Sequence, residues 1–126
     1  MKDDPFEILR LHHVSLVISN TVRSVDFYQN LLGLEWVHDR PDLGFPGAWF
    51  QIGDQQIHLL EVPNSDPVQG RPRHGGRDRH VAFHVQGLEK FCQKLDEASI
   101  VFTRSRSGRA AIFLRDPDGN GIELIG

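Results

Sequence analysis

The chain reads as one supersecondary unit written twice, and this duplication limits what it can fold into more than any other feature. One copy begins with a histidine, His13, at the head of an apolar segment, and the other begins in the same way at His80. In each copy the apolar segment alternates as a strand does, a helix-like segment follows, and further strand-like segments come after it. The duplication predicts two similar sheets with a histidine at the same place in each.

The periodicity predicts the order βαβββ in both copies. In the first copy we expect a helix over residues 22–32 and strands over residues 11–18, 34–38, 48–52 and 56–62. In the second copy we expect a helix over residues 88–98 and strands over residues 79–85, 100–103, 110–114 and 122–125. The polar linker 63–78, rich in Pro, Gly and Arg, separates repeats spanning about residues 10–62 and 79–126. We expect one domain over residues 1–126.

Size and composition exclude several classes of protein. A chain of 126 residues is long enough to bury a core as one domain. It has no apolar run of 18 residues, and its charged N-terminus does not resemble a secretory signal. The single cysteine, Cys92, cannot form an internal disulfide, and it lies in a helical pattern as a packing residue. These features favour a cytoplasmic protein without a membrane span.

Charge is distributed unevenly between the two halves. Residues 1–70 carry four basic and ten acidic side chains, whereas residues 71–115 carry ten basic and four acidic ones. One interpretation is a solvated surface through which the halves, or two copies, attract each other. The other is an arginine rim that binds an anion, because Arg grips carboxylate and phosphate with a forked set of donors. The net charge of −3 and the lack of interleaved aromatic residues argue against nucleic acid.

Two more polar residues occupy corresponding places in the copies. His58 lies 45 residues after His13, and Glu123 lies 43 residues after His80, so both gaps run from the first strand of a unit to its fourth. If those strands pair, and if a pseudo-twofold axis relates the units, the four side chains reach a common centre. Three imidazoles and one carboxylate suit Fe, Ni, Zn, Co or Mn, and they do not suit Ca or Mg.

Strand alternation also predicts which side chains share the face of these histidines. In residues 79–85, His80 and His84 lie on the side opposite Val81 and Phe83. The helix that follows must cover the apolar side, so the histidine side faces something polar. His84 is therefore a candidate for substrate contact or for a wall of the cavity, whereas His74 in the linker is expected at the surface.

At these positions the chain resembles the vicinal oxygen chelate superfamily. That superfamily includes glyoxalase I, methylmalonyl-CoA epimerase, fosfomycin-modifying thiol transferases, extradiol dioxygenases and bleomycin resistance proteins. The resemblance covers about residues 10–126. It rests on five segments taken together, namely HVSLV from His13, SVDFY from Ser24, IHL from Ile57, HVAF from His80 and DPDG from Asp116.

The resemblance implies an α+β fold in which two βαβββ modules form curved mixed sheets around a metal-binding cleft. It places one divalent transition metal ion on His13, His58, His80 and Glu123. One departure stands out: bacterial glyoxalase I typically has a glutamate where this chain has His58, and many thiol transferases and dioxygenases use three protein ligands. His58 is thus either a ligand or a neighbour that contacts the substrate. Members are commonly homodimers, and the ligands come from one chain or from two.

By resemblance, the first functional hypothesis is a metal-dependent lyase or isomerase of the lactoylglutathione lyase type. Its substrate would carry adjacent oxygens, as a thiol hemithioacetal of an α-oxoaldehyde does. Glu123 and His58 would move the proton, and an anionic tail would bind a group of arginines: Arg71, Arg73, Arg77 and Arg79. The alternatives are an Fe(II) dioxygenase or thiol transferase of the same superfamily, and a non-catalytic protein that binds an antibiotic or other small molecule.

Overall fold

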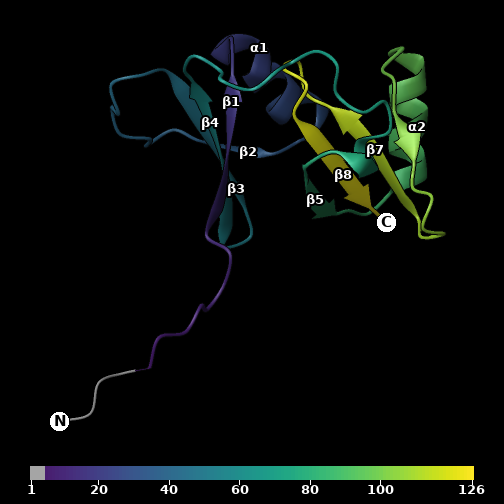
Figure 1. Cartoon of the computed structure of the whole chain (residues 1–126), viewed down its shortest axis with the longest axis horizontal. Coiled ribbons are helices and arrows are strands. Elements are labelled where there is room, and N and C mark those ends of the chain that lie inside the picture. The colour runs from purple at the N-terminus through teal and green to yellow at the C-terminus, as the bar shows by residue number, and fades with distance from the viewer. Residues whose placement is uncertain (1–4) are drawn as a thin grey trace.

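The computed structural model describes residues 5–126, which form two four-stranded mixed sheets (Figure 1). The first sheet has the strand order β1 (His13–Ile18), β4 (Gln55–Glu61), β3 (Gly47–Ile52) and β2 (Glu35–Val37). The second has the order β5 (His80–His84), β8 (Gly121–Ile125), β7 (Ala111–Arg115) and β6 (Thr103–Arg104). β1 pairs with β4, and β5 with β8, in parallel, whereas the other neighbours are antiparallel. The predicted α+β fold of two βαβββ modules is confirmed.

The helices agree with the prediction in place but differ in detail. In the first module α1 (Thr21–Val25) begins after Asn20, whose side chain accepts a hydrogen bond from the Arg23 backbone, and it continues as the π-helix η1 (Asp26–Leu31). In the second module α2 spans Leu88–Glu97. The linker contributes a short 3₁₀ helix, η2 (Gly75–Arg77).

The second strand of the second module begins later than predicted. Residues 100–103 were expected to form it, but β6 starts only at Thr103. The reason lies at the end of α2, where Ser99 adopts a positive φ of 58° and the Ile100 N–H donates to Leu95 O at 2.8 Å. This contact satisfies a carbonyl at the helix end, so Ile100 terminates the helix instead of joining a sheet.

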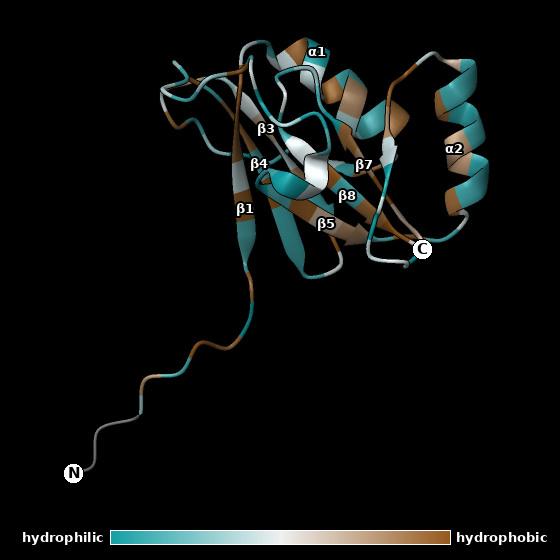
Figure 2. Ribbon diagram, turned by 45° about the vertical axis from the view of Figure 1, so that its right-hand side comes forward, coloured by the Kyte–Doolittle hydropathy of each residue, from teal (hydrophilic) through white to brown (hydrophobic). Residues whose placement is uncertain are grey.

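The apolar side of each sheet packs into the core, and the helices lie against it (Figure 2). The largest fully buried side chains come from both modules and include Tyr28, Phe50, Leu59, Leu95, Ile112 and Ile122. On β1 and β5 the alternation is as predicted, because Val14 and Val81 pack against the core while His13 and His80 face outward. The histidine-bearing sides of β1 and β5 are therefore not the sides that the helices cover.

The turn between β7 and β8 ties the second module to the first. The Tyr28 hydroxyl donates to Asp116 Oδ2 at 2.7 Å, and Asn120 Nδ2 donates to Val17 O at 3.0 Å. Arg23 adds an ion pair with Asp118 at 3.4 Å. Burial raises the pKa of Asp116, although the hydrogen bonds that its carboxylate accepts oppose that rise. These contacts fix the two modules relative to each other.

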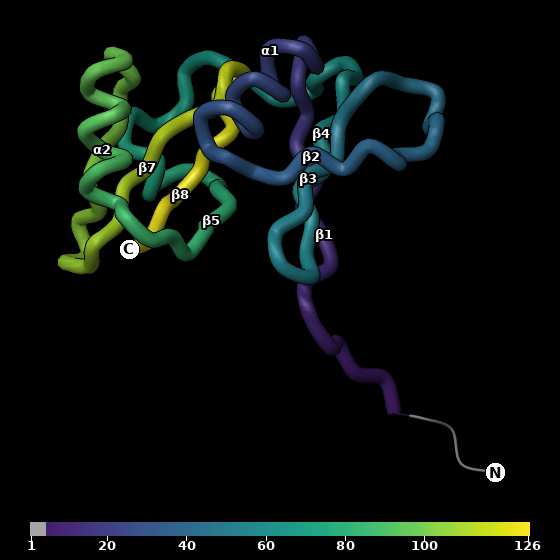
Figure 3. The backbone as a smooth tube through the Cα atoms, turned by 180° about the vertical axis from the view of Figure 1, so that it is seen from behind, coloured from purple at the N-terminus to yellow at the C-terminus, as the bar shows by residue number. Residues whose placement is uncertain are grey.

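Residues 5–9 form an arm before β1 that extends away from both sheets (Figures 1 and 3). This arm carries several large apolar side chains in water, and Phe6, Ile8 and Leu9 are at least three-quarters exposed. A run of exposed apolar residues usually marks a contact surface. Within the described residues, none of the helices has the length and apolar content to cross a membrane.

Candidate metal-binding site

Each module brings its own two predicted ligands together. The rings of His13 and His58 stack with their centroids 4.1 Å apart and an interplanar angle of 19°. In the other module His80 Nε2 lies 3.2 Å from Glu123 Oε1. We call these the N-terminal pair and the C-terminal pair.

The strand register shows that the two pairs are structurally equivalent. In the first sheet His58 lies opposite Ser15, two residues beyond His13. In the second sheet Glu123 lies opposite Ala82, two residues beyond His80. Both pairs therefore sit on the first and fourth strands of a module with the same diagonal offset, as the repeat predicts.

The two pairs do not meet within one chain. Among residues 5–126, no group of three or more His, Cys, Asp or Glu side chains is close enough to hold one metal ion. The expectation that the halves of a single chain gather all four ligands at a common centre is therefore not met. The described residues instead hold two separate pairs of candidate ligands.

In the C-terminal pair, two hydrogen-bond acceptors, His80 Nε2 and Glu123 Oε1, face each other. His80 Nδ1 lies 2.8 Å from the Asp78 carbonyl oxygen, which only accepts, so this nitrogen carries a hydrogen and donates it. In the neutral ring Nε2 then has a lone pair, and it faces a carboxylate oxygen of Glu123. Two facing acceptors require a cation between them, either a proton or a metal ion. Histidines that bind a metal through one ring nitrogen usually donate a hydrogen bond from the other nitrogen, often to a backbone carbonyl.

The separation within the C-terminal pair fits a transition metal. Nitrogen and oxygen ligands lie about 2.0–2.2 Å from such an ion, so two ligands of one ion are about 3 Å apart. The 3.2 Å between His80 and Glu123 matches that spacing. Glu123 is only 2% exposed, and a buried carboxylate needs a charged or hydrogen-bonding partner.

The N-terminal pair is organised by stacking. Trp49 stacks on His58 with centroids 4.2 Å apart, so three rings from β3, β4 and β1 lie in a row. His58 Nε2 lies 2.8 Å from Gln56 Oε1, and the amide of Gln56 donates in turn to Gln51. In this series of hydrogen bonds, His58 carries its hydrogen on Nε2 and keeps a free lone pair on Nδ1.

Burial, together with the charges of His13, His12 and Arg40, lowers the pKa of His58 to about 4. The ring is therefore neutral near pH 7, which is the state that binds a metal ion. The neighbouring His12 places its Nδ1 2.9 Å from His13 Nδ1.

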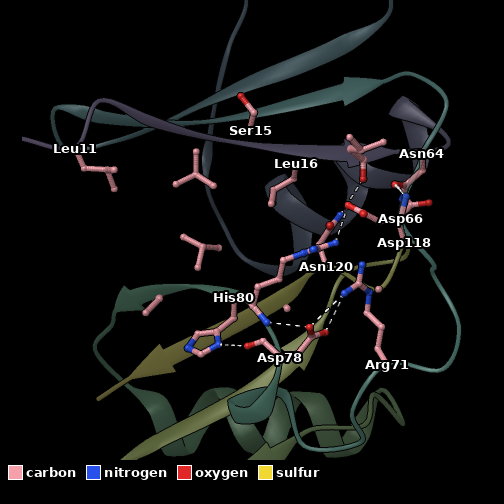
Figure 4. A pocket seen from close by; sticks show the side chains of 17 residues that line it. Leu11, Ser15, Leu16, Asn64, Asp66, Arg71, Asp78, His80, Asp118 and Asn120 are labelled. Carbon is pink, nitrogen blue, oxygen red and sulfur yellow. Dashed lines mark hydrogen bonds and ion pairs between the residues drawn. The ribbon is translucent and has the colours of Figure 1, made fainter.

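The four arginines expected to bind an anionic tail do not converge. A cavity of about 480 Å³ opens between β1 and β5, with His80 on its wall (Figure 4). Arg71 and Arg79 line this cavity, but Arg71 is 3.2 Å from Asp78 and Arg79 is 2.8 Å from Asp66. Arg73 lines a separate cavity of about 290 Å³, and Arg77 is exposed in η2. His84 is exposed on the same strand face as His80.

Two residues beside the C-terminal pair, Arg109 and Asp78, were not predicted from the sequence. Arg109 Nη2 lies 3.0 Å from Glu123 Oε2. Asp78 accepts from Arg115 at 2.8 Å and from Arg71, and this anchored residue supplies the carbonyl that orients His80. Burial alone would raise the pKa of Asp78, but the hydrogen bonds from Arg115 and the Arg79 backbone lower it below its ordinary value.

The linker packs beneath His80, which corrects the expectation that His74 is a surface residue. His74 is buried, bonds Thr103 through Nδ1 at 2.7 Å, and meets the Phe113 ring edge-on. Phe113 in turn meets the His80 ring edge-on at 5.0 Å. The approach needs glycine at position 75, because a Cβ there would lie 2.9 Å from Phe113 Cβ.

The fold and the sequence assign the chain to a known protein superfamily. The Glyoxalase/Bleomycin resistance protein/Dioxygenase superfamily matches residues 10–124, and the chain belongs to this superfamily. A glyoxalase-family protein of Bacillus anthracis has a solved structure with a TM-score of 0.78 and 25% identity, with 96% of this chain and 97% of that chain covered.

The relatives include enzymes of more than one kind. The chain is 30% identical to Glyoxylase I 4 of Arabidopsis thaliana, over 98% of this chain and 76% of the relative. It is 30% identical to lactoylglutathione lyase of Neisseria meningitidis serogroup B, over 93% and 90%. It is 31% identical to glutathione transferase FosA of Serratia marcescens, over 90% and 78%. Lyases and a transferase are thus about equally similar to this chain.

Proposed function

We propose that the chain is a metal-dependent glyoxalase-type lyase or isomerase acting on a substrate with adjacent oxygen atoms, such as the hemithioacetal of a thiol and an α-oxoaldehyde. The observation that carries this proposal is the facing pair of acceptors, His80 Nε2 and Glu123 Oε1, 3.2 Å apart. The equivalent offset of His13 and His58 supports it from the other module.

The complete site requires a homodimer in this proposal. The N-terminal pair of one copy would join the C-terminal pair of the other, which gives three imidazoles and one carboxylate around one ion. Two features support this assembly: each pair has an exposed histidine, His13 or His80, at the start of a strand, and the arm before β1 exposes Phe6, Ile8 and Leu9. Fe, Ni, Zn, Co and Mn all suit such a donor set.

A divalent ion at this centre would polarise the substrate carbonyl as a Lewis acid. The proton-transfer groups that we propose are Glu123 and His58. His58 is neutral at the pH of the cell because its pKa is about 4, and Gln56 orients its ring. Glu123 is shielded from water, which strengthens its interaction with charge that develops in the substrate.

For the anionic end of the substrate we propose Arg79 as the first contact among the four arginines. It lines the cavity beside His80, and its pair with Asp66 is solvent-exposed on both sides, so little free energy is lost when it exchanges partners. Arg71 is already held by Asp78, and Arg73 and Arg77 lie outside this cavity. His84 lies on the same strand face as His80 and is proposed to contact the substrate further along β5.

The second candidate is a thiol transferase of the same superfamily. It is favoured by the similarity to FosA and by His58, which the family resemblance places where bacterial glyoxalase I typically has a glutamate. In this alternative His58 binds the ion or the substrate and moves no proton. Both reactions fit the cytoplasm, where glutathione is the major small thiol.

A mixing experiment tests the two-chain site. One variant, His13→Ala with His58→Ala, lacks the N-terminal pair, and the other, His80→Ala with Glu123→Ala, lacks the C-terminal pair. Each alone should bind Mn(II) or Zn(II) weakly. A mixture refolded together should regain one tight site per heterodimer, because one of the two sites across its interface carries both intact pairs. No recovery in a mixture shown to form heterodimers would remove the two-chain site.

An activity assay separates the two candidate reactions. The lyase should convert glutathione and methylglyoxal to a thioester, seen as rising ultraviolet absorbance, when loaded with one of the proposed metals. The transferase should instead consume glutathione only when an electrophile such as an epoxide is supplied. Absence of thioester formation with every proposed metal would exclude the lyase, whatever the outcome of the mixing experiment.

A further inference from the structure

Arg109 is the only arginine whose guanidinium contacts a proposed metal ligand among the hydrogen bonds of residues 5–126. Its Nη2 lies 3.0 Å from Glu123 Oε2, while His80 faces the other oxygen, Oε1, at 3.2 Å. The two carboxylate oxygens of Glu123 thus have different partners. One faces the proposed ion site, and the other is held by a fixed cation.

Resting on the proposed function, we propose that Arg109 is a positioning residue that limits Glu123 to one metal-coordinating oxygen. Carboxylates bind metal ions through one oxygen or through both. A charge-assisted hydrogen bond from Arg109 occupies Oε2 and leaves Oε1 for the ion. Because Glu123 is buried, water cannot easily take over the role of Arg109.

The consequence concerns the substrate. With three imidazole nitrogens and one carboxylate oxygen, an ion that takes about six ligands keeps two positions open, and a second carboxylate oxygen would fill one of them. A substrate that chelates through two adjacent oxygens needs both. Arg109 would therefore set how many positions the protein leaves for the substrate.

The loop that carries Arg109 is held in place. The Ser105 N–H donates to Ala111 O at 2.9 Å, which closes the hairpin at the base of the loop. At the same end Arg104 makes two contacts with Glu89 of α2, each 3.2 Å long. The loop therefore presents Arg109 to Glu123 from a fixed base, although the arginine side chain is 57% exposed.

The test counts water molecules on a bound ion and needs no substrate. Purified protein is loaded with Mn(II), bound and free ion are separated by electron paramagnetic resonance, and the relaxation of water protons is measured per bound ion. Arg109→Ala should lose about half of the enhancement, since one of two coordinated waters is replaced by Glu123 Oε2. Arg109→Lys, which keeps one cationic donor, should restore most of it.

The matched control is Arg106→Ala. Arg106 belongs to the same loop, is exposed, and makes no side-chain hydrogen bond or ion pair within the described part of the chain, so its loss should leave the relaxation unchanged. Wild-type relaxation per bound ion in Arg109→Ala would overturn the role of Arg109 while leaving the metal site intact. A wild-type protein that binds no Mn(II), Zn(II) or Co(II) would overturn the proposed function and this inference with it.

Discussion

The two modules place their ligand pairs at the same strand positions but support them in different ways. In the second module Glu123 is buried, Arg109 and His80 occupy its oxygens, and the Asp78 carbonyl orients His80. In the first module the His13 and His58 rings are held mainly by stacking on Trp49 and by an amide chain. The C-terminal pair is surrounded by charged groups, and the N-terminal pair by stacked rings.

The repeat therefore preserves the strand positions of the two pairs, while the residues around them differ. Strand pairing fixes where the first and fourth strands place a side chain, and this is the same in both modules. The neighbours that set charge and orientation come from loops and from the linker, which are not repeated. The C-terminal pair is held by residues of its own chain, whereas His13 of the N-terminal pair is exposed next to the arm.

The largest expected effect is on the stability of the second module, whose ion pairs centre on Asp78. Asp78→Ala removes the shared partner of Arg71 and Arg115, both of which are largely buried. Breaking such a pair leaves buried cations uncompensated, so the free energy of unfolding of the metal-free protein should fall by about 3 kcal/mol. Urea denaturation measures this change.

The control for Asp78 is Asp66→Ala, which breaks the exposed pair with Arg79 and should cost roughly 0.5 kcal/mol or less. An equal loss of unfolding free energy in the two variants would show that the ion pairs of Asp78 do not stabilise the second module more than an exposed pair does.

The first module should respond to changes in the arm. Ile8 is 81% exposed, and burial of such a side chain against a second copy contributes about 1.5–3 kcal/mol. Ile8→Ser should therefore weaken dimerisation by about tenfold or more, as measured by sedimentation equilibrium. Val22→Ser on α1 is the matched control, because Val22 is also 82% exposed and lies outside the arm. Equal dimer affinities in the two variants would exclude the arm from the interface.

The ring stack should matter for metal affinity more than for folding. Trp49→Leu removes the outer ring from His58, and loss of such orienting contacts typically weakens metal binding by about tenfold. Competition with a chromophoric chelator measures it. Trp36→Leu, on the opposite face of the same sheet, should lower stability while the affinity stays unchanged. The reverse pattern would assign Trp49 to the core alone.

Much of this architecture was accessible from the sequence because it depends on local periodicity. Alternation around His13 and His80 predicted which side of each strand packs against the core, and the repeat predicted that His58 and Glu123 lie on the fourth strands. These features follow from the period of a strand and from parallel pairing, so they need no knowledge of distant contacts.

What could not be predicted depends on contacts between distant residues or on a second chain. Arg115 meets Asp78 across 37 residues, and Arg109 reaches Glu123 from a loop whose path no pattern reports. The common centre failed within one chain because periodicity fixes the face of each strand but not which two modules face each other. The stacking of Trp49 on His58 follows from the β3–β4 register, which places the two residues directly opposite each other. A hairpin pairing of these two segments was the only sequence signal that could have predicted it.

The smallest expected effect concerns protonation of His58. His58 has a pKa of about 4 in the folded chain, against about 6.5 when unfolded. As the pH falls from 6.5 toward 4, the unfolded state takes up this proton first, so the metal-free protein should lose stability over that range and regain it as the pH rises. Because the ring is partly exposed, solvent screening limits the change to about 1 kcal/mol.

His58→Gln removes the titrating group and should flatten the dependence of the free energy of unfolding on pH between 6.5 and 4. Measuring this free energy in urea at several pH values, for wild type and variant, isolates the contribution of His58. His84→Gln is the control, since His84 is an exposed histidine on the other module. If both variants keep the wild-type slope, His58 is not held neutral by its surroundings, and the contrast between His58 and the charged groups around Glu123 loses its basis.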